Sequence, residues 1–533
     1  MKKAISPILA IILAWAIALP AGALDEKFNM SYIYFGSPSD YSNLVDRTQD
    51  SVNEVAPAYF SLTKKGELVL TPAVSTEFVS KMHEKGILVV PYITNDWVQE
   101  TGIAAMNNKH KLTDDLAAAV RKYDLDGINV DIENLTEKQR DDYVEFVRLL
   151  REKLPKGKRI VVAVAANPWG STTGWAGSYD YAALAKYCDY LMIMAYDESY
   201  QGSKPGPVAS ISFVERSIQY ALKHVSRDKL VLGLPFYGRI WSTSGSAMNG
   251  YGISNSTVES LIANYRGYVT FDNASKSARA TITVKSGDKK PVIGGKALPA
   301  GTYVIWYSNE QAIKAALDLV RKYDLMGTGS WSLGQETART WDYYKLWLNG
   351  ATFADVQYSW AKKEILAAYM NGWMTGISAD KFSPGTSLTR AEATTVIVRM
   401  TGLPAEKGSL FDDAIGHWAE AYIDTAKRYG LVSGTGDNSF EPDRPITRAE
   451  MAVLLNNILG YSAGSKTFRD VTKDRYPWAY DAISALHMQG IITGYTDNSF
   501  KPQNYITRAE MAALITRLDT SLMSAYAFSV QKD

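Results

Sequence analysis

The chain contains 533 residues, of which 46% are hydrophobic and 21% are charged, and its formal net charge is +1. This composition is ordinary for a globular protein and excludes a mainly disordered chain and a bundle of membrane helices. The near-zero charge provides no broad field for nucleic acid or anionic lipid, so neither is expected as a partner. The single cysteine, Cys188, rules out internal disulfides and thiolate zinc clusters, and we interpret it as a small buried apolar residue.

The first residues have the features of a secretory signal peptide. Lys2 and Lys3 provide a positive start, residues 8–19 form an unbroken apolar run, and the small residues up to Ala23 fit a cleavage site. An uncleaved membrane anchor is the alternative, but the run is shorter than the ~20 residues that a helix needs to span a bilayer. We therefore predict a signal peptide over residues 1–23 and a secreted protein that is free of the membrane after cleavage.

Residues 24–350 contain apolar, β-rich segments that alternate with helical segments, which is the pattern of an α/β-class (β/α)8 (TIM) barrel. The expected strands cover residues 31–35, 58–62, 87–93, 127–133, 160–166, 190–195, 230–237 and 327–333. The segment between Arg239 and Leu325 is longer than one helical crossover needs, and part of it is strand-like. We expect a small α+β insertion there, between the seventh and eighth strands, that forms one wall of a substrate cleft.

The fourth expected strand alternates polar and apolar side chains. Asn129, Asp131 and Glu133 should point into the barrel, while the apolar residues between them pack against helices. Glu133 lies at the C-terminal end of the strand, where barrel enzymes place their catalysis. Burial and mutual repulsion should raise the pKa of one carboxyl and keep it protonated near neutral pH, as a glycosidase acid requires. A metal site is the alternative, but no histidine is nearby, so we predict neither a metal nor a cofactor.

This strand resembles the Asp-x-x-Asp-x-Asp-x-Glu signature of family 18 glycoside hydrolases. Three further segments match that family in the right order: residues 194–197 at strand six, residues 233–239 at strand seven, and Trp331 at the end of strand eight. The resemblance covers essentially the whole expected barrel, which makes it far more specific than one motif alone.

The resemblance implies substrate-assisted retaining hydrolysis, in which the carbonyl oxygen of the sugar's own 2-acetamido group is the nucleophile. Glu133 would protonate the glycosidic oxygen, and Asp131 would orient the acetamido N–H and stabilise the oxazolinium charge. Tyr196 would hydrogen-bond to the acetamido carbonyl. Asp197 would help to hold the distorted sugar, and Trp331 would form an apolar floor beneath it.

Met194, Tyr237 and Arg239 complete the implied substrate-binding set, although Tyr237 and Arg239 could equally be packing residues at the strand end. Asn129 joins the implied catalytic set but departs from the family, which has an aspartate there that shares a proton with the next one. Asparagine can still hydrogen-bond to Asp131, yet it cannot share a proton. An asparagine here resembles the bacterial branch that includes spore-cortex-lytic enzymes, which cleave after N-acetylglucosamine in peptidoglycan-type glycans.

The C-terminal third repeats itself. The three repeats are expected at residues 353–405, 411–462 and 468–520. Each contains the tetrapeptide Thr-Arg-Ala-Glu, whose threonine and glutamate form a capping box that begins a helix. Capping does not explain the arginines, since a cation in the first turn opposes the helix dipole, so we predict an anionic ligand near them. These arginines are Arg390, Arg448 and Arg508.

The repeats resemble S-layer homology (SLH) domains, helical units that form a pseudo-trimer whose grooves bind secondary cell-wall polymers. By this resemblance the three arginines pair with carboxylates of the polymer and hold the protein at the cell wall. One tryptophan recurs in each repeat, and for these tryptophans we favour packing in the core over direct contact with the polymer. They are Trp360, Trp418 and Trp478.

We therefore predict a wall-anchored hydrolase of glycans that contain N-acetylglucosamine, with peptidoglycan or its cortex fragments as the substrate and chitin as the alternative. A catalytically silent glycan-binding surface protein is a second hypothesis, which only Asn129 favours, because the acid Glu133 is present. A purely structural S-layer subunit would leave the acidic strand unexplained.

Overall fold

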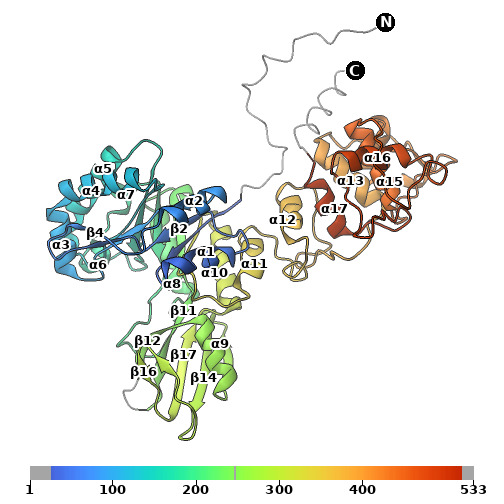
Figure 1. Cartoon of the computed structure of the whole chain (residues 1–533). Helices are drawn as coiled ribbons and strands as arrows, with labels where there is room; N and C mark the ends of the chain where they lie inside the picture. The colour runs from blue at the N-terminus through green and yellow to red at the C-terminus, as the bar shows by residue number, and fades with distance from the viewer. Residues whose placement is uncertain (1–25, 245–247, 519–533) are drawn as a thin grey trace. The chain divides into compact units, whose positions relative to one another are not determined.

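The computed structural model describes residues 26–244 and 248–518 (Figure 1). It divides into two compact units, one over Lys27–Gly350 and the other from Ala351 onward. The predicted signal peptide, residues 1–23, lies outside the described residues. Within the described ranges, no helix is long and apolar enough to cross a membrane.

The first unit is built on a ring of parallel strands. They are β1 (Phe28–Ile33), β2 (Glu54–Pro57), β5 (Leu88–Val89), β6 (Tyr92–Thr94), β7 (Gly127–Asp131), β8 (Arg159–Ala165), β9 (Tyr190–Met194), β10 (Leu230–Pro235) and β18 (Gly327–Trp331). β1 pairs with both β18 and β2. β5 and β6 are two pieces of one expected strand, interrupted at Pro91; β5 pairs with β2 and β6 pairs with β7, which completes the ring. The predicted (β/α)8 fold is confirmed.

The second barrel strand lies earlier in the chain than predicted. We expected it at residues 58–62, but the strand that pairs with β1 is β2. The segment β3 (Phe60–Leu62) instead pairs antiparallel with β4 (Leu68–Leu70) and meets β6 at one position. β2 contains a glutamate and a proline, and both residue types are uncommon in strands. Its position therefore could not be recognised from the sequence pattern alone.

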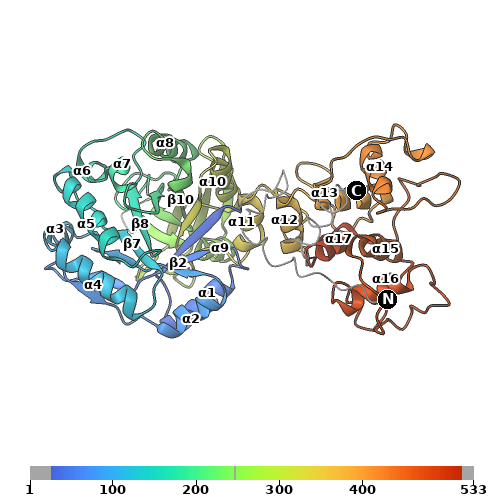
Figure 2. The same cartoon turned by 90° about the horizontal axis from the view of Figure 1, so that it is seen from above.

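Helices surround these strands (Figure 2). They are α1 (Tyr41–Asp46), α2 (Thr76–Glu84), α3 (Gln99–Asn107), α4 (Lys109–Lys122), α5 (Arg140–Lys153), α6 (Gly174–Gly177), α7 (Tyr181–Leu184), α8 (Ile211–Leu222), α10 (Glu310–Lys322) and α11 (Thr340–Leu348). One apolar cluster lies between strands and helices and includes Ile128, Val130 and Cys188. A second cluster fills the barrel interior and includes Tyr32 and Met192.

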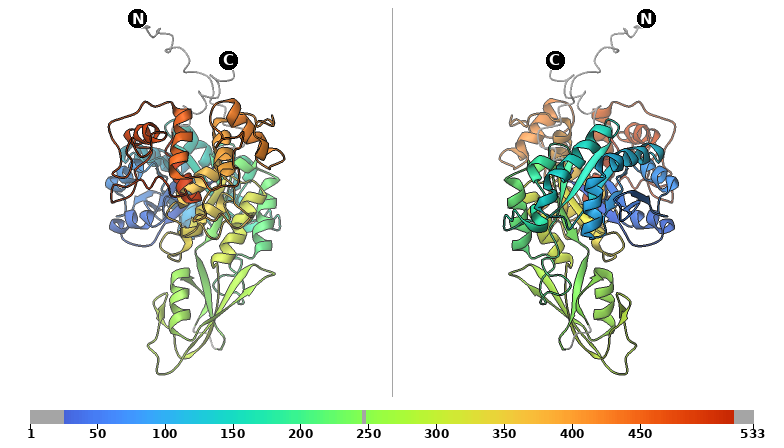
Figure 3. Two further views of the ribbon diagram at one scale, coloured as in Figure 1. Left: turned by 90° about the vertical axis from the view of Figure 1, so that its right-hand side faces the viewer. Right: turned by 90° about the vertical axis from the view of Figure 1, so that its left-hand side faces the viewer.

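The insertion between the seventh and eighth barrel strands is an α+β unit, as predicted. Its antiparallel sheet has the order β12-β11-β17-β14-β13. The elements are β11 (Tyr237–Ser242), β12 (Asn249–Ser254), α9 (Asn255–Asn264), β13 (Tyr268–Asp272), β14 (Ser277–Val284), β15 (Val292–Ile293), β16 (Lys296–Ala297) and β17 (Gly301–Tyr307). The helix α9 lies against this sheet (Figure 3). Residues of both form a separate apolar core that includes Ile240, Val258 and Ile305.

The second unit is helical and holds two helices for each repeat. They are α12 (Lys362–Met370), α13 (Arg390–Thr401), α14 (Glu420–Arg428), α15 (Arg448–Leu459), α16 (Tyr480–Met488) and α17 (Arg508–Ile515). The expected capping boxes begin α13, α15 and α17. Backbone N–H groups of Leu388, Ile446 and Ile506 donate cyclically to the carbonyls of Ile506, Leu388 and Ile446, at 3.0, 3.0 and 3.2 Å. The three repeats therefore form a closed ring.

Candidate active site

The polar side chains of β7 lie inside the barrel, as the alternation predicts. Asn129 is fully buried and Asp131 is 5% exposed. The hydroxyl of Tyr32, which belongs to the interior apolar cluster, donates to Oδ1 of Asn129 at 3.3 Å. Glu133 follows just beyond the end of β7 and is partly buried. Three polar residues thus meet at the C-terminal end of one barrel strand.

Burial raises the pKa of both carboxyls at this strand end. Desolvation raises the pKa of Asp131 to about 7. The pKa of Glu133 lies well above its ordinary value because of desolvation and then because of the negative charges of Asp131 and Asp197. A low dielectric and neighbouring like charges both disfavour the ionised form. The protonated form of Glu133 is therefore favoured, which is the form that a proton donor needs.

Two buried polar atoms of β7 have no hydrogen-bond partner among the described residues. They are Oδ1 of Asp131 and Nδ2 of Asn129. Since buried polar groups are nearly always paired, these two atoms are available to a ligand that enters the site. One atom is an acceptor and the other is a donor, so a group with one N–H and one carbonyl, such as a secondary amide, matches them.

Asp197, which follows β9, is held by two side chains of β11. Its Oδ1 accepts a hydrogen bond from the hydroxyl of Tyr237 at 2.7 Å and from Nη2 of Arg239 at 2.8 Å. Arg239 also donates through Nη1 to the carbonyl of Gly250 in β12, at 2.8 Å. The insertion therefore supplies the groups that fix Asp197. Tyr237 and Arg239 thus both contact an acidic residue of the site, and their contact with substrate stays a prediction.

Aromatic rings border the carboxyls. Trp331 ends β18, and its ring centroid lies 5.1 Å from that of Tyr32. The ring centroid of Tyr196 lies 6.1 Å from that of Tyr237, and burial raises the pKa of the Tyr196 hydroxyl well above its ordinary value. Met194 is only 6% exposed and packs in the interior apolar cluster. Its proposed contact with substrate stays a prediction.

A further set of aromatic residues, not singled out from the sequence, follows the C-terminal ends of barrel strands. These exposed side chains are Tyr34 and Phe35 after β1, Trp97 after β6, Trp169 after β8 and Tyr200 after β9. Trp97 also makes an edge-to-face contact with Trp175, with ring centroids 4.8 Å apart. Exposed rings at this end of a barrel provide flat surfaces for a sugar, and their positions in the segments that follow strands were the available signal.

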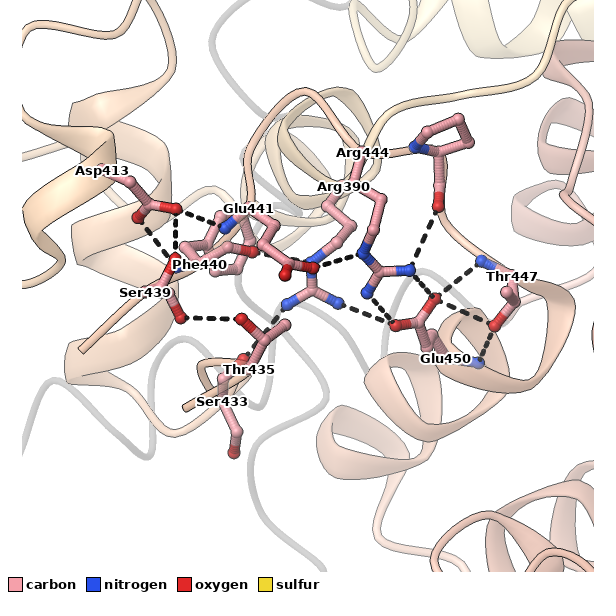
Figure 4. A network of polar contacts seen from close by, with 11 residues as sticks. Arg390, Asp413, Ser433, Thr435, Ser439, Phe440, Glu441, Arg444, Thr447 and Glu450 are labelled. Carbon is pink, nitrogen blue, oxygen red and sulfur yellow. Dashed lines mark hydrogen bonds and ion pairs between the residues drawn. The ribbon is translucent and has the colours of Figure 1, made fainter. Parts of the chain in front are cut away.

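In the repeat unit, Arg390 reaches from the first repeat into the second (Figure 4). Its Nε donates to the carbonyl of Phe440 at 2.8 Å, and its Nη2 donates to the carbonyl of Ser433 at 3.3 Å. Its Nη1 lies 3.3 Å from Oε1 of Glu450, the glutamate of the next Thr-Arg-Ala-Glu motif. Arg444 binds the same carboxylate, with Nη2 at 2.5 Å from Oε1. Arg390 therefore joins two repeats.

The other two motif arginines repeat this arrangement. Arg448 donates through Nε to the carbonyl of Phe500 at 2.8 Å and lies 3.1 Å from Glu510. Arg508 donates through Nε to the carbonyl of Phe382, also at 2.8 Å. In the described part of the chain, Nη2 of Arg448 has no partner, whereas Nη2 of each of the other two arginines donates to a backbone carbonyl. Among the three motif arginines, Arg448 is therefore the one whose Nη2 is unpaired within the described residues.

Two grooves lie beside these arginines. The Arg448 groove, of about 300 Å³, is lined among others by Trp360, Arg448, Tyr495 and Glu510. The Arg390 groove, of about 350 Å³, is lined among others by Arg390, Glu450 and Trp478. The expectation that the repeat tryptophans pack in the core is wrong. Trp360, Trp418 and Trp478 are 68%, 60% and 53% exposed. The residues that follow the tryptophan of the second repeat, among them Ala419 and Ile423, occupy the core position instead.

Comparisons with known proteins agree with this arrangement. The family model "Glycosyl hydrolases family 18" matches residues 30–336, and the model "S-layer homology domain" matches residues 352–394, 410–452 and 467–512. The glycosylase YvbX of Bacillus subtilis (strain 168) is 26% identical over 352 residues, which cover 64% of this chain and 98% of YvbX. The cortical fragment-lytic enzyme of the same organism is 24% identical over 291 residues, 53% of this chain and 64% of that enzyme. The crystal structure of the Bacillus cereus spore cortex-lytic enzyme SleL has the same fold, with a TM-score of 0.52 at 18% identity over 61% of this chain and 75% of SleL.

Proposed function

Because the chain belongs to family 18 of the glycosyl hydrolases and carries three S-layer homology repeats, we propose that it cleaves peptidoglycan or cortex glycan at the cell wall. The bond cleaved is the β-1,4 bond after N-acetylglucosamine, and the configuration of the sugar is retained. The observation that carries this proposal is the Asp131–Glu133 pair, in which an acid with a pKa well above its ordinary value lies two residues from a carboxyl group with an unpaired acceptor oxygen.

In the proposed reaction, Glu133 donates its proton to the glycosidic oxygen as the bond to the anomeric carbon breaks. The free Oδ1 of Asp131 accepts the N–H of the 2-acetamido group and directs its carbonyl oxygen to the anomeric carbon. That oxygen forms the new bond and gives an oxazolinium ion, whose positive charge Asp131 stabilises. The Glu133 carboxylate then removes a proton from water, which opens the ion and restores the acid.

The remaining residues fit the same reaction. The amide of Asn129 and the hydroxyl of Tyr196 are donors for the acetamido carbonyl oxygen, which matches the orphan Nδ2 of Asn129. Asp197, fixed by Tyr237 and Arg239, holds the distorted sugar. The ring of Trp331 forms the floor of the site.

Three observations favour a wall glycan over chitin as the substrate. Asn129 stands where typical chitinases have an aspartate that shares a proton with the next one. One of the similar enzymes is a cortical fragment-lytic enzyme. The S-layer homology repeats would hold the barrel at the wall, where peptidoglycan is the nearest glycan.

The test is a parallel digestion of purified peptidoglycan, cortex fragments and chitin oligomers, with the products sized by mass spectrometry. Cleavage on the reducing side of N-acetylglucosamine in the wall samples is the expected result. Cleavage of chitin oligomers alone would contradict the proposed substrate. Glycan binding without turnover of any sample would indicate a silent binding protein.

We also propose that the Arg448 groove takes an acidic polymer of the cell wall. The free Nη2 of Arg448 suits a carboxylate, and the exposed ring of Trp360 suits the face of a sugar. The Arg448 guanidinium lies 5.1 Å from the ring of Tyr495, and Nζ of Lys501 lies 4.0 Å from that ring, so the groove combines aromatic and positive character. Sedimentation with wall fragments that keep or lack their secondary polymer tests this partner.

A further inference from the structure

Asn95 makes a two-point contact with the backbone of Glu133. It follows directly after β6 and is 2% exposed. Its Oδ1 accepts the N–H of Glu133 at 2.8 Å, and its Nδ2 donates to the Glu133 carbonyl at 2.9 Å. The second hydrogen of Nδ2 goes to the carbonyl of Val98, also at 2.9 Å. Both donors of the amide are thus in use, which leaves the side chain one conformation.

This contact begins where the strand ladder stops. The pairing of β6 with β7 ends at Thr94 opposite Asp131, so backbone pairing does not reach Glu133. The chain then turns at Asn134, whose φ of 58° lies in the left-handed region. Without a further contact, the backbone of the proposed acid would have no hydrogen bonds to a neighbouring strand that hold it in place. The Asn95 amide continues the pairing beyond the strand ladder, because its side chain makes the two hydrogen bonds to the Glu133 backbone.

Gly102 provides an independent observation that points to the same amide. It lies near the start of α3, where glycine is less favourable than alanine. A Cβ atom at this position would lie 2.9 Å from Nδ2 of Asn95 and 3.0 Å from Cδ2 of Leu135. A side chain at position 102 would therefore displace the Asn95 amide or the turn after Glu133.

We propose that Asn95 is a positioning residue that fixes Glu133 for proton transfer to the glycosidic oxygen. This inference rests on the proposed hydrolase function, because it assigns Asn95 a part in that reaction. Asn95 acts only through the Glu133 backbone. A displacement of a reacting group by about 1 Å can cost up to ~10²-fold in rate, so a loose Glu133 peptide lowers kcat more than it changes binding.

Two variants test the kinetic part. Asn95→Ala removes the amide, and Gly102→Ala pushes against it from α3. Both are expected to lower kcat by ~10- to 100-fold with KM within about 2-fold of the wild type. In both variants, the alkaline limb of the pH–rate profile should move to lower pH. A displaced Glu133 would leave the buried position beside Asp131, and that position is what raises the pKa of Glu133.

Gln99→Ala is the matched control. Gln99 is the first residue of α3, and its Nε2 donates to the carbonyl of Asn134 at 2.9 Å, one residue beyond Glu133. Its removal should leave kcat within about 2-fold and the alkaline limb unmoved. A loss of folded protein alone would lower the rate without moving the alkaline limb of the pH–rate profile. If Asn95→Ala shows a wild-type position of this limb, or a wild-type kcat, the inference is overturned.

Amide hydrogen exchange gives a readout that does not need turnover. Asn95→Ala removes the acceptor of the Glu133 N–H, so exchange in residues 131–135 should rise, whereas Gln99→Ala should leave it unchanged. Unchanged exchange in Asn95→Ala would overturn the contact itself. If wild type and Glu133→Gln hydrolyse glycan equally, the proposed function fails, and the exchange comparison still decides whether Asn95 holds Glu133.

Discussion

Arg508 in the third repeat donates a hydrogen bond through Nε to the carbonyl of Phe382 in the first repeat, at 2.8 Å. Its Nη2 donates to the carbonyl of Thr375 at 2.5 Å. Arg508 is 6% exposed, and burial lowers the pKa of its guanidinium below the usual value. This contact joins the last repeat to the first and closes the ring. The motif arginines therefore have a structural role, whether or not they also meet an anion.

Arg508→Met should lower the free energy of unfolding of the repeat unit by about 2–3 kcal/mol, because the carbonyls of Phe382 and Thr375, the first of them buried, lose charge-assisted hydrogen bonds. Urea unfolding of the full chain measures the change. The matched control is Arg469→Met, which removes an exposed ion pair to Asp497 in the same repeat and should leave stability unchanged. Equal losses in the two variants would contradict the ring contact.

Glu133→Gln should reduce kcat by ~10²-fold or more, since the amide keeps the shape of the side chain but has no acidic proton to transfer. Stability should not fall, because the site favours the neutral form of Glu133 and the amide is also neutral. Release of reducing ends from peptidoglycan glycan measures the rate. Glu152→Gln, an exposed change on α5, is the control and should keep full activity. Equal rates for wild type and Glu133→Gln would rule out Glu133 as the acid.

Glu54 should make the stability of the barrel depend on pH. It is fully buried on β2, where it accepts hydrogen bonds from Tyr190 at 2.6 Å and Arg159 at 3.0 Å, yet desolvation raises its pKa to about 7. The folded state therefore binds the proton more tightly than the unfolded state, so this stabilising contribution is present at acidic pH and is lost as pH rises through about 7. The loss is on the order of 3 kcal/mol.

Urea unfolding at pH 5 and pH 8 checks this dependence. Glu54→Gln should make the barrel's stability fall less between these two values, because the amide has no proton to lose. Glu77→Gln, an exposed change on α2, should leave the fall as it is in the wild type. If the stability of Glu54→Gln falls between pH 5 and pH 8 as much as that of the wild type, other groups cause the pH dependence.

Local patterns predicted the parts of the structure that depend on one segment at a time. Alternation along β7 placed Asn129 and Asp131 inside the barrel because that strand is buried on both faces. β2 was missed because Glu54 finds its partners on distant strands, which no local pattern reveals. The Asn95–Glu133 contact likewise depends on two strands that become neighbours only in the fold.

The repeat unit shows the same limit. The Thr-Arg-Ala-Glu capping boxes follow from local spacing and are present. The partners of each arginine lie in the next repeat around the ring, so they depend on closure. The tryptophans were expected in the core because large aromatic residues are usually buried, but here they lie exposed beside grooves.

Asn129→Asp should move the alkaline limb of the rate profile to higher pH. The new carboxyl would stand beside Asp131 and near Glu133, and a further negative charge raises the pKa of the acid. The hydroxyl of Tyr32, which donates to Oδ1 of Asn129, could donate equally to an aspartate. Rates on peptidoglycan and chitin oligomers from pH 5 to pH 9 measure the shift. A limb at unchanged or lower pH would show that position 129 does not interact with Glu133.

Trp360→Ala should weaken sedimentation with cell-wall fragments by ~5-fold or more, because an exposed ring at a groove loses its contact with sugar faces. This variant is a sharper test than removal of the three motif arginines, since those residues also hold the ring together. Ile415→Ala, which removes an exposed apolar side chain from the second repeat, is the control and should sediment like the wild type.

Arg448→Lys adds a second test of the Arg448 groove. Lysine keeps the positive charge but lacks the planar guanidinium that binds a carboxylate through two hydrogen bonds, so the variant should weaken wall binding with the barrel's activity unchanged. If both variants sediment normally with walls that keep their secondary polymer, the Arg448 groove is not the attachment site, and the Arg390 groove beside Trp478 becomes the one to change next.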